Sequence, residues 1–123
     1  MRINLIKVQV MNMRFASLPL LCALGMVLAP AEAAAPVYTL IIKAQGFQPQ
    51  ELSIPADTQV QLIISNQDDL PAEFESDDLS REIVVPAHGQ VKVYIGPLDP
   101  GRYRFFNDFH PSSQGWVVVA AGK

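Results

Sequence analysis

The chain has 123 residues, with nine Lys and Arg against twelve Asp and Glu, which gives a formal net charge of −3. An acidic balance argues against nucleic acid as a partner and suits cations or a basic protein surface. The single cysteine, Cys22, lies near the start, so disulfides, thiol catalysis and thiolate metal sites are excluded for the rest of the chain.

Residues 1–33 have the pattern of a secretory signal peptide. Three basic residues precede an apolar run over residues 15–29, and small residues follow over 30–36. A positive start, an apolar middle and a small-residue end are typical of a segment removed on export. The run is shorter than the about 20 apolar residues of a membrane span. We therefore expect cleavage after Ala33, a periplasmic protein and no membrane anchor; the alternative is an amphipathic anchoring helix.

Export would leave one domain over residues 34–123. Arg2, Lys7, Arg14 and Glu32 precede it, so the domain keeps six basic and eleven acidic side chains and a formal charge of −5. About 90 residues are enough for one small hydrophobic core. The sequence therefore predicts a single acidic domain without cysteine.

Short apolar segments follow one another along this domain. Val60, Leu62 and Ile64 alternate with polar residues over 58–65, which is the period of a half-buried strand. Other strands are predicted over residues 37–44, 51–54, 81–85, 91–95, 102–105 and 116–119. Residues 46–49 are predicted as a turn that buries Phe47, and residues 66–78 as a loop with six acids, anchored by Phe74.

This spacing, with Pro and Gly turns and no helical periodicity, predicts an all-β fold. We expect an antiparallel Greek-key β-sandwich or barrel of seven or eight strands. Residues 98–103 match a tyrosine corner, in which a phenol binds the backbone across a Greek-key connection, so Tyr103 is interpreted as structural.

The segment 101–119 combines a strand, a polar loop and a strand. Its loop carries Asp108, His110 and Gln114, and loops at one end of a sandwich converge. Glu73 of the acidic loop can therefore meet His110. One imidazole with carboxylates suits Cu(II), iron or another borderline divalent ion, whereas Cu(I) prefers sulfur. The alternatives are a histidine that only stabilises its own loop and a solvated Glu73.

Enzyme signatures are absent from the sequence. There is no Gly-rich phosphate loop after a strand, no two-histidine helix motif and no serine–histidine–acid pattern. If Glu73 and Glu75 lie on a strand, we place them on opposite faces of it, and so expect no catalytic carboxylate pair there. Glu75 and Asp77 are expected to recruit or relay a cation nearby. The chain is therefore not expected to be an enzyme.

The domain resembles a cupredoxin over its whole length. The matching stretches are GFQPQELSIPADTQVQLIISNQD (46–68), AEFES (72–76) and PGRYRFFNDFHPSSQGWVVV (100–119). His110 keeps the second histidine position of that family. Glu73 stands where the first histidine is expected, Asn107 replaces the thiolate, and Gln114 replaces the axial methionine. Without a thiolate the resemblance implies a non-blue Cu(II) or iron site made of His110, Glu73, Asp108 and Gln114.

The closest pattern is a cysteine-free branch, similar to the cupredoxin-like domain of EfeO-type proteins and to small periplasmic cupredoxins of bacterial ferrous-iron uptake. That resemblance implies a protein that assists iron oxidation or delivery beside a permease and a periplasmic iron-binding protein, with an accessory redox role. Two alternatives stay open. One is a metal-free adaptor that docks the acidic residues 66–78 on a basic partner, and the other is a copper carrier or resistance protein.

Overall fold

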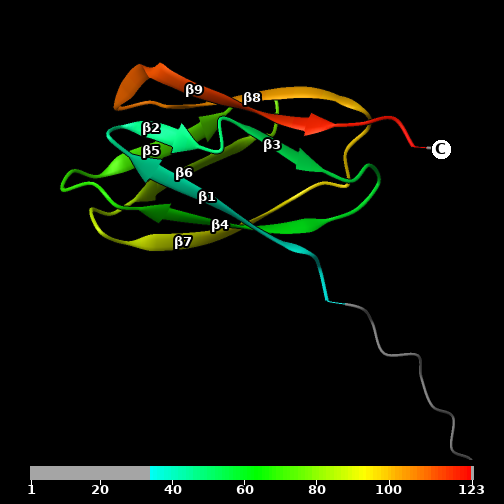
Figure 1. The fold of residues 1–123 in the computed structure, drawn as a ribbon, viewed down its shortest axis with the longest axis horizontal. Helices are drawn as coiled ribbons and strands as arrows, with labels where there is room; N and C mark the ends of the chain where they lie inside the picture. The colour runs from blue at the N-terminus through cyan, green and yellow to red at the C-terminus, as the bar shows by residue number, and fades with distance from the viewer. Residues whose placement is uncertain (1–33, 123) are drawn as a thin grey trace, which may run out of the picture. The chain divides into compact units, whose positions relative to one another are not determined.

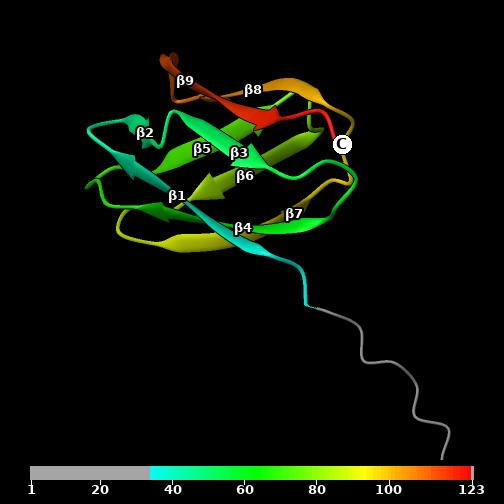
Figure 2. The same cartoon turned by 45° about the vertical axis from the view of Figure 1, so that its right-hand side comes forward.

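The computed structural model describes residues 34–122, so the predicted signal peptide lies outside the described part. Those residues form two sheets (Figures 1 and 2). Their nine strands are β1 (Val37–Lys43), β2 (Gly46–Gln48), β3 (Glu51–Ile54), β4 (Val60–Asn66), β5 (Ala72–Ser76), β6 (Arg81–Val85), β7 (Gln90–Ile95), β8 (Gly101–Asn107) and β9 (His110–Val119). No helix long and apolar enough to cross a membrane occurs in this range.

The strands form the two layers of a β-sandwich, as the sequence predicts. One sheet has the order β2-β1-β4-β7 and the other the order β3-β9-β8-β5-β6. The expectation of purely antiparallel pairing is wrong at two places, because β1 pairs with β4 and β3 pairs with β9 in parallel. Strands far apart in sequence are therefore neighbours in both sheets.

The core lies between the sheets and follows from the alternation along each strand. Val60, Leu62 and Ile64 of β4 are fully buried, as predicted. The ring of Phe105 packs edge-on against Phe47 at 4.9 Å between centroids, and it packs in a tilted arrangement against Phe74 at 5.2 Å. Phe47 and Phe74, the two aromatic residues that the sequence predicts to be buried, thus both contact the ring of Phe105. Burial of apolar surface of this kind is the main stabilising contribution to folding.

Three predicted boundaries are wrong. Residues 46–48 form the short strand β2 instead of a turn, and the turn before it consists of Ala44 and Gln45, both at positive φ. The stretch predicted as an acidic loop contains β5. Strand β9 begins at His110, so the loop between β8 and β9 is only Asp108 and Phe109.

Polar contacts join the turns at the end of the sandwich where β8 turns into β9 (left in Figures 1 and 2). Asp68 accepts hydrogen bonds from the amides of Ala44 and Gln45, both at 2.7 Å, and so holds the β1–β2 turn. The amide of His88, in the β6–β7 turn, donates to the Asp68 carbonyl at 3.1 Å. At the opposite end, the Tyr103 hydroxyl donates to the Asp99 carbonyl at 2.6 Å, which is the predicted tyrosine-corner contact.

Candidate metal centre

Three carboxylates from two segments meet on the outer face of the five-stranded sheet. Glu73 and Glu75 of β5 and Asp108 of the β8–β9 loop each present a carboxylate oxygen, and these oxygens lie within 4.8 Å of one another. Glu73 and Glu75 are half-buried and Asp108 is exposed. Groups this close can hold one cation, because Ca²⁺-, Mg²⁺- and iron-type sites use carboxylate oxygens from neighbouring elements.

Backbone pairing between β5 and the β8–β9 hairpin brings the carboxylates together. The Asp108 amide donates to the Glu73 carbonyl at 2.9 Å. Asn107 is almost fully buried, and its side-chain oxygen accepts hydrogen bonds from the amides of Glu73 at 3.0 Å and Phe109 at 3.1 Å. A buried amide that joins both segments fixes their spacing, since breaking either bond would leave a buried donor unpaired.

The interpretation that Glu73 and Glu75 point to opposite faces is wrong. Residues two apart on a strand share a face, and the burial of β5 alternates so that Ala72, Phe74 and Ser76 face the core while both glutamates face outward. Sequence reasoning thus missed Glu75 as a member of the cluster, although the period of two in AEFES was enough to find it.

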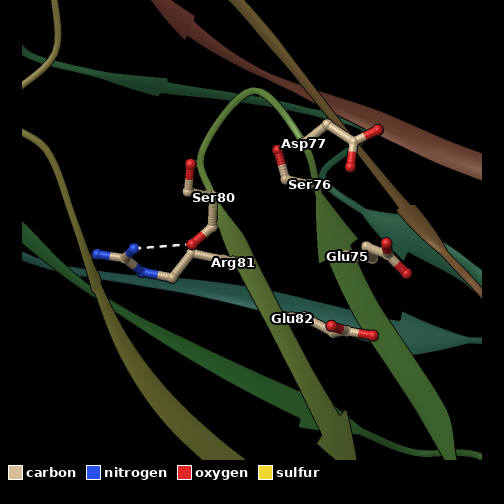
Figure 3. Close-up of a pocket in the computed structure, with 6 residues that line it drawn as sticks. All are labelled: Glu75, Ser76, Asp77, Ser80, Arg81 and Glu82. Carbon is tan, nitrogen blue, oxygen red and sulfur yellow. Dashed lines mark hydrogen bonds between the residues drawn. The ribbon is translucent and has the colours of Figure 1, made fainter.

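A fourth acid, Glu82 of β6, lies beside the cluster. The register pairs it directly with Glu75, and Figure 3 shows the two side chains next to each other on neighbouring strands. They line an open depression of about 340 Å³ together with Ser76, Asp77, Ser80 and Arg81. The Arg81 guanidinium is turned away from these acids, because it donates twice to the Tyr94 carbonyl. The sequence alone could not identify Glu82 as a neighbour of the cluster, since its position opposite Glu75 depends on how β5 pairs with β6.

The cluster is electrostatically unfavourable when every acid is ionised. A hydrogen bond with Glu82, which Glu73 can donate only when protonated, raises the pKa of Glu73 from 4.5 to about 7, with help from desolvation and from the charges of Glu82, Asp108 and Glu75. Desolvation, followed by the charges of Asp108 and Glu82, also raises the pKa of Glu75. A bound cation would relieve this repulsion and favour the ionised forms.

His110 does not join the three carboxylates. It lies opposite Asn107 in the β8–β9 pairing, and directly opposed residues of an antiparallel pair share a face. Asn107 points into the core, whereas Glu73 points outward. A β-bulge interrupts the β8–β9 register between Phe106 and Asn107, and the imidazole of His110 is not among the ligand groups that converge at Glu73, Glu75 and Asp108.

Gln114, the residue at the expected axial position, has another partner. Its side-chain oxygen accepts a hydrogen bond from Nε of Arg104 at 2.6 Å. It pairs with Phe106 across β8 and β9, outside the cluster of carboxylates. Of the four ligands expected from the sequence, the structure thus brings together Glu73 and Asp108, and not His110 or Gln114.

The donor set decides which metal chemistry fits these residues. The positions of the family's thiolate and first histidine carry Asn107, which faces the core, and Glu73, which faces outward, so a thiolate–imidazole copper centre does not fit. A set of carboxylate oxygens fits hard or borderline cations instead, and is a poor match for Cu(I).

Comparisons with known proteins give the family. A family model described as a cupredoxin-like domain matches residues 16–119. A protein of Rickettsia prowazekii (strain Madrid E), described only as uncharacterized, is 42% identical over 81 residues. This match covers 65% of the present chain and 65% of the relative, so the chain spans less than two thirds of that protein's length.

Solved structures share the fold. A purple cupredoxin from Nitrosopumilus maritimus has a TM-score of 0.50 and 24% identity, and the match covers 67% of this chain and 98% of that one. Amicyanin from Paracoccus versutus gives 0.53 and 20%, with coverages of 73% and 85%. The metal-binding domain of a Cu(I)-exporting P-type ATPase from Streptococcus pneumoniae, solved with Cu(I), gives 0.62 and 13%, with coverages of 78% and 99%.

The fold is thus related to that of copper-binding proteins. The family model spans most of the sequence, including all nine strands of the described part. The chain belongs to the family of cupredoxin-like domains.

Proposed function

We propose that this chain is a periplasmic metal-binding protein that holds an exchangeable cation at Glu73, Glu75 and Asp108 and serves a bacterial ferrous-iron uptake system. The observation that carries the proposal is the convergence of three carboxylates within 4.8 Å. Membership of the cupredoxin-like family supports a metal-related role. The iron-uptake context is supported by the resemblance to cysteine-free cupredoxins of such systems.

Iron fits the cluster better than copper does. Carboxylate oxygens are hard ligands, and neither sulfur nor imidazole belongs to the group. Iron in either oxidation state accepts such a set, and glutamates hold iron in the carboxylate proteins of helical bundles. We therefore take iron as the physiological ion and Cu(II) as a competitor, with a permease and a periplasmic iron-binding protein as partners.

The chain's own contribution is to bind and release the ion. We propose that the protein is not an enzyme by itself. Any oxidation of ferrous iron would then depend on a partner or on dioxygen, with the three carboxylates favouring the ferric product through their charge.

Metal titration tests the proposal. Protein purified from its host is stripped with a chelator and titrated by calorimetry with Fe(II) under nitrogen and with Cu(II). We expect one site, and an affinity for iron that falls more than tenfold, or about 1.4 kcal/mol, in Glu73→Gln and Asp108→Asn. Asp99→Asn is the matched control, because Asp99 is exposed and lies at the opposite end of β8.

His110→Ala separates the two possible sites. If the carboxylates alone hold the ion, this variant binds iron about as tightly as the wild type. A loss of affinity confined to His110→Ala, with Glu73→Gln unchanged, would instead place the ion at the imidazole. Absence of binding in the wild type would contradict the proposal and favour the adaptor role of residues 66–78, whose partner binding should weaken with salt. Copper binding without iron binding would favour the copper carrier.

A further inference from the structure

The outer face of the five-stranded sheet carries charges of both signs. Its side chains are the outward residues of β5, β6, β8 and β9, and all are partly or fully exposed. They include Glu73, Glu75, Glu82, Arg102, Arg104, Phe106, Gln114 and Trp116. Below, "the outer face" means these eight residues. The core lies on the opposite side of the sheet, so the outer face is free to meet a partner.

The arginines of the outer face lie over aromatic rings. The guanidinium of Arg102 lies 4.9 Å from the ring centroid of Trp116, and that of Arg104 lies 4.6 Å from the ring centroid of Phe106. Arg102 also forms an ion pair with Glu51 at 2.9 Å. The guanidinium of Arg104 bonds the neutral Gln114 and forms no ion pair in the described residues, while the backbone amide of Arg104 donates to the Asp78 carboxylate at 2.8 Å. Stacked arginines and exposed aromatics are typical of protein interfaces, since ordering them in advance lowers the entropy cost of binding.

The acids of the outer face lack a matching cation. Within residues 34–122, the ion pairs are His88 with Asp69 and Arg102 with Glu51, and neither includes Glu73, Glu75 or Glu82. Glu75 is opposite Phe106 in the β5–β8 register, and Arg104 lies two residues further along β8. At about 3.4 Å per residue and 4.8 Å between strands, the backbones of Arg104 and Glu75 are about 8 Å apart.

We propose that the outer face docks on the outer face of a second copy of this chain, as a two-fold symmetric dimer. Facing sheets pack about 10 Å apart. A two-fold axis in the plane between them, passing midway between Arg104 and Glu75, places Arg104 of each copy over Glu75 of the other. Arg104 and Glu75, which form no ion pair within one copy, then form two ion pairs with the other copy, one on each side of the axis.

The mixture of signs selects a second copy over other partners. A basic partner would be repelled by the arginines, and an acidic one by the three glutamates. A second copy has the complementary arrangement by symmetry, because an isologous interface matches each patch with its own counterpart. Phe106 and Trp116 add apolar area between the charges. The dimer forms without a metal, and because it covers Glu75, an ion bound at Glu73, Glu75 and Asp108 would oppose it.

Sedimentation equilibrium of the purified protein in chelator tests the dimer, at protein concentrations on the order of 100 µM. We expect a monomer–dimer equilibrium whose dissociation constant rises at least about tenfold between low and high salt, because the contacts are exposed charges. Arg104→Glu and Glu75→Arg should each be monomeric, since each reversal places like charges opposite one another at both ends of the interface.

Mixing the two reversed variants gives the decisive result. When an Arg104→Glu copy meets a Glu75→Arg copy, the two substituted residues form one ion pair with its signs reversed. The unchanged Glu75 of the first copy and Arg104 of the second form the original ion pair. We expect a heterodimer to form, although neither variant dimerises alone. Lys92→Glu, a charge reversal on the exposed side of β7 in the other sheet, is the control and should dimerise as the wild type does.

Three results would overturn the proposal. These are a wild type that stays monomeric at low salt, a dimer that survives both reversals, and a mixture that fails to form the heterodimer. Circular dichroism of each variant shows whether the fold is kept, so that loss of the dimer is not confused with unfolding. Because chelator is present throughout, a negative result here leaves the metal titration unaffected.

Discussion

Glu73 is the residue at which fold and chemistry are most closely coupled. Its amide and carbonyl are fixed by Asn107 and Asp108, while its carboxyl faces three other acids. The backbone contacts hold the side chain where its ionisation is unfavourable. Positions of this type, with a strongly shifted pKa caused by neighbouring charges, are enriched at functional sites.

This coupling predicts a pH-dependent stability for the metal-free protein. The pKa of Glu73 is about 7 in the folded chain and near 4.5 when unperturbed. Between these values the folded state binds more protons than the unfolded state, so the free energy of unfolding decreases as pH rises from about 4.5 to about 7. The raised pKa of Glu75 acts in the same direction.

Urea denaturation at a series of pH values, with chelator present, measures this slope. Glu73→Gln should flatten it, because the amide cannot ionise. A stability that increases through this window, or a variant with the wild-type slope, would show that the acids do not repel one another as described. A saturating cation should oppose the slope, since it stabilises the ionised cluster.

At the scale of elements, β9 depends on one glycine for its path beside β8. Gly115 lies directly opposite Phe105. A Cβ atom at this position would be 2.6 Å from the Phe105 ring and 2.7 Å from the Gln50 carbonyl oxygen. Phe105 is fully buried and contacts both Phe47 and Phe74, so the ring has no free space to move into.

Gly115→Ala should therefore destabilise the fold by about 1–3 kcal/mol, the usual cost of overpacking a core. The measurement is chemical denaturation of the variant beside the wild type. Gly122→Ala, where a Cβ would meet nothing within 4 Å, is the control. Equal midpoints for Gly115→Ala and the wild type would mean that β9 shifts freely from β3 and β8.

At the scale of the whole molecule, the predicted export signal precedes the first strand. The first strand starts at Val37, three residues after the expected cut. Cleavage after Ala33 would remove three basic residues and one acid, and so leave the cation-attracting domain more acidic. Mass spectrometry of the protein from the periplasmic fraction should give a chain that begins at Ala34. A full-length chain recovered from the cytoplasm would contradict export and, with it, the iron-uptake proposal.

The sequence predicts the sandwich well because alternation is a local signal. The alternation of Val60, Leu62 and Ile64 with polar residues shows that these three share a face, even when the strands that pair with β4 are not known. The short strand β2 escapes prediction, since its three residues are too few to show a period. The two parallel pairs also escape, because β1–β4 and β3–β9 pairing depends on the path of the chain through space.

The candidate site is predictable only in part for the same reason. The proximity of Glu73 and Asp108 follows from the idea that segments at one end of a sandwich converge. The face on which each side chain lies requires the register. In the structure His110 lies outside the group formed by Glu73, Glu75 and Asp108, and Gln114 accepts a hydrogen bond from Arg104. Glu75 is different, since the period of two along β5 was available from the sequence alone.

In the monomer, the location of the three carboxylates on the solvent side of the five-stranded sheet has a kinetic consequence. An ion held there reaches bulk water without any opening of the sandwich, so its residence time depends on breaking ion–oxygen bonds alone. A chelator in the medium should then remove it in a single fast phase. An ion enclosed between the layers would leave only as often as the sheets separate. The surface position is therefore suited to a shuttle that hands its cargo to the next protein.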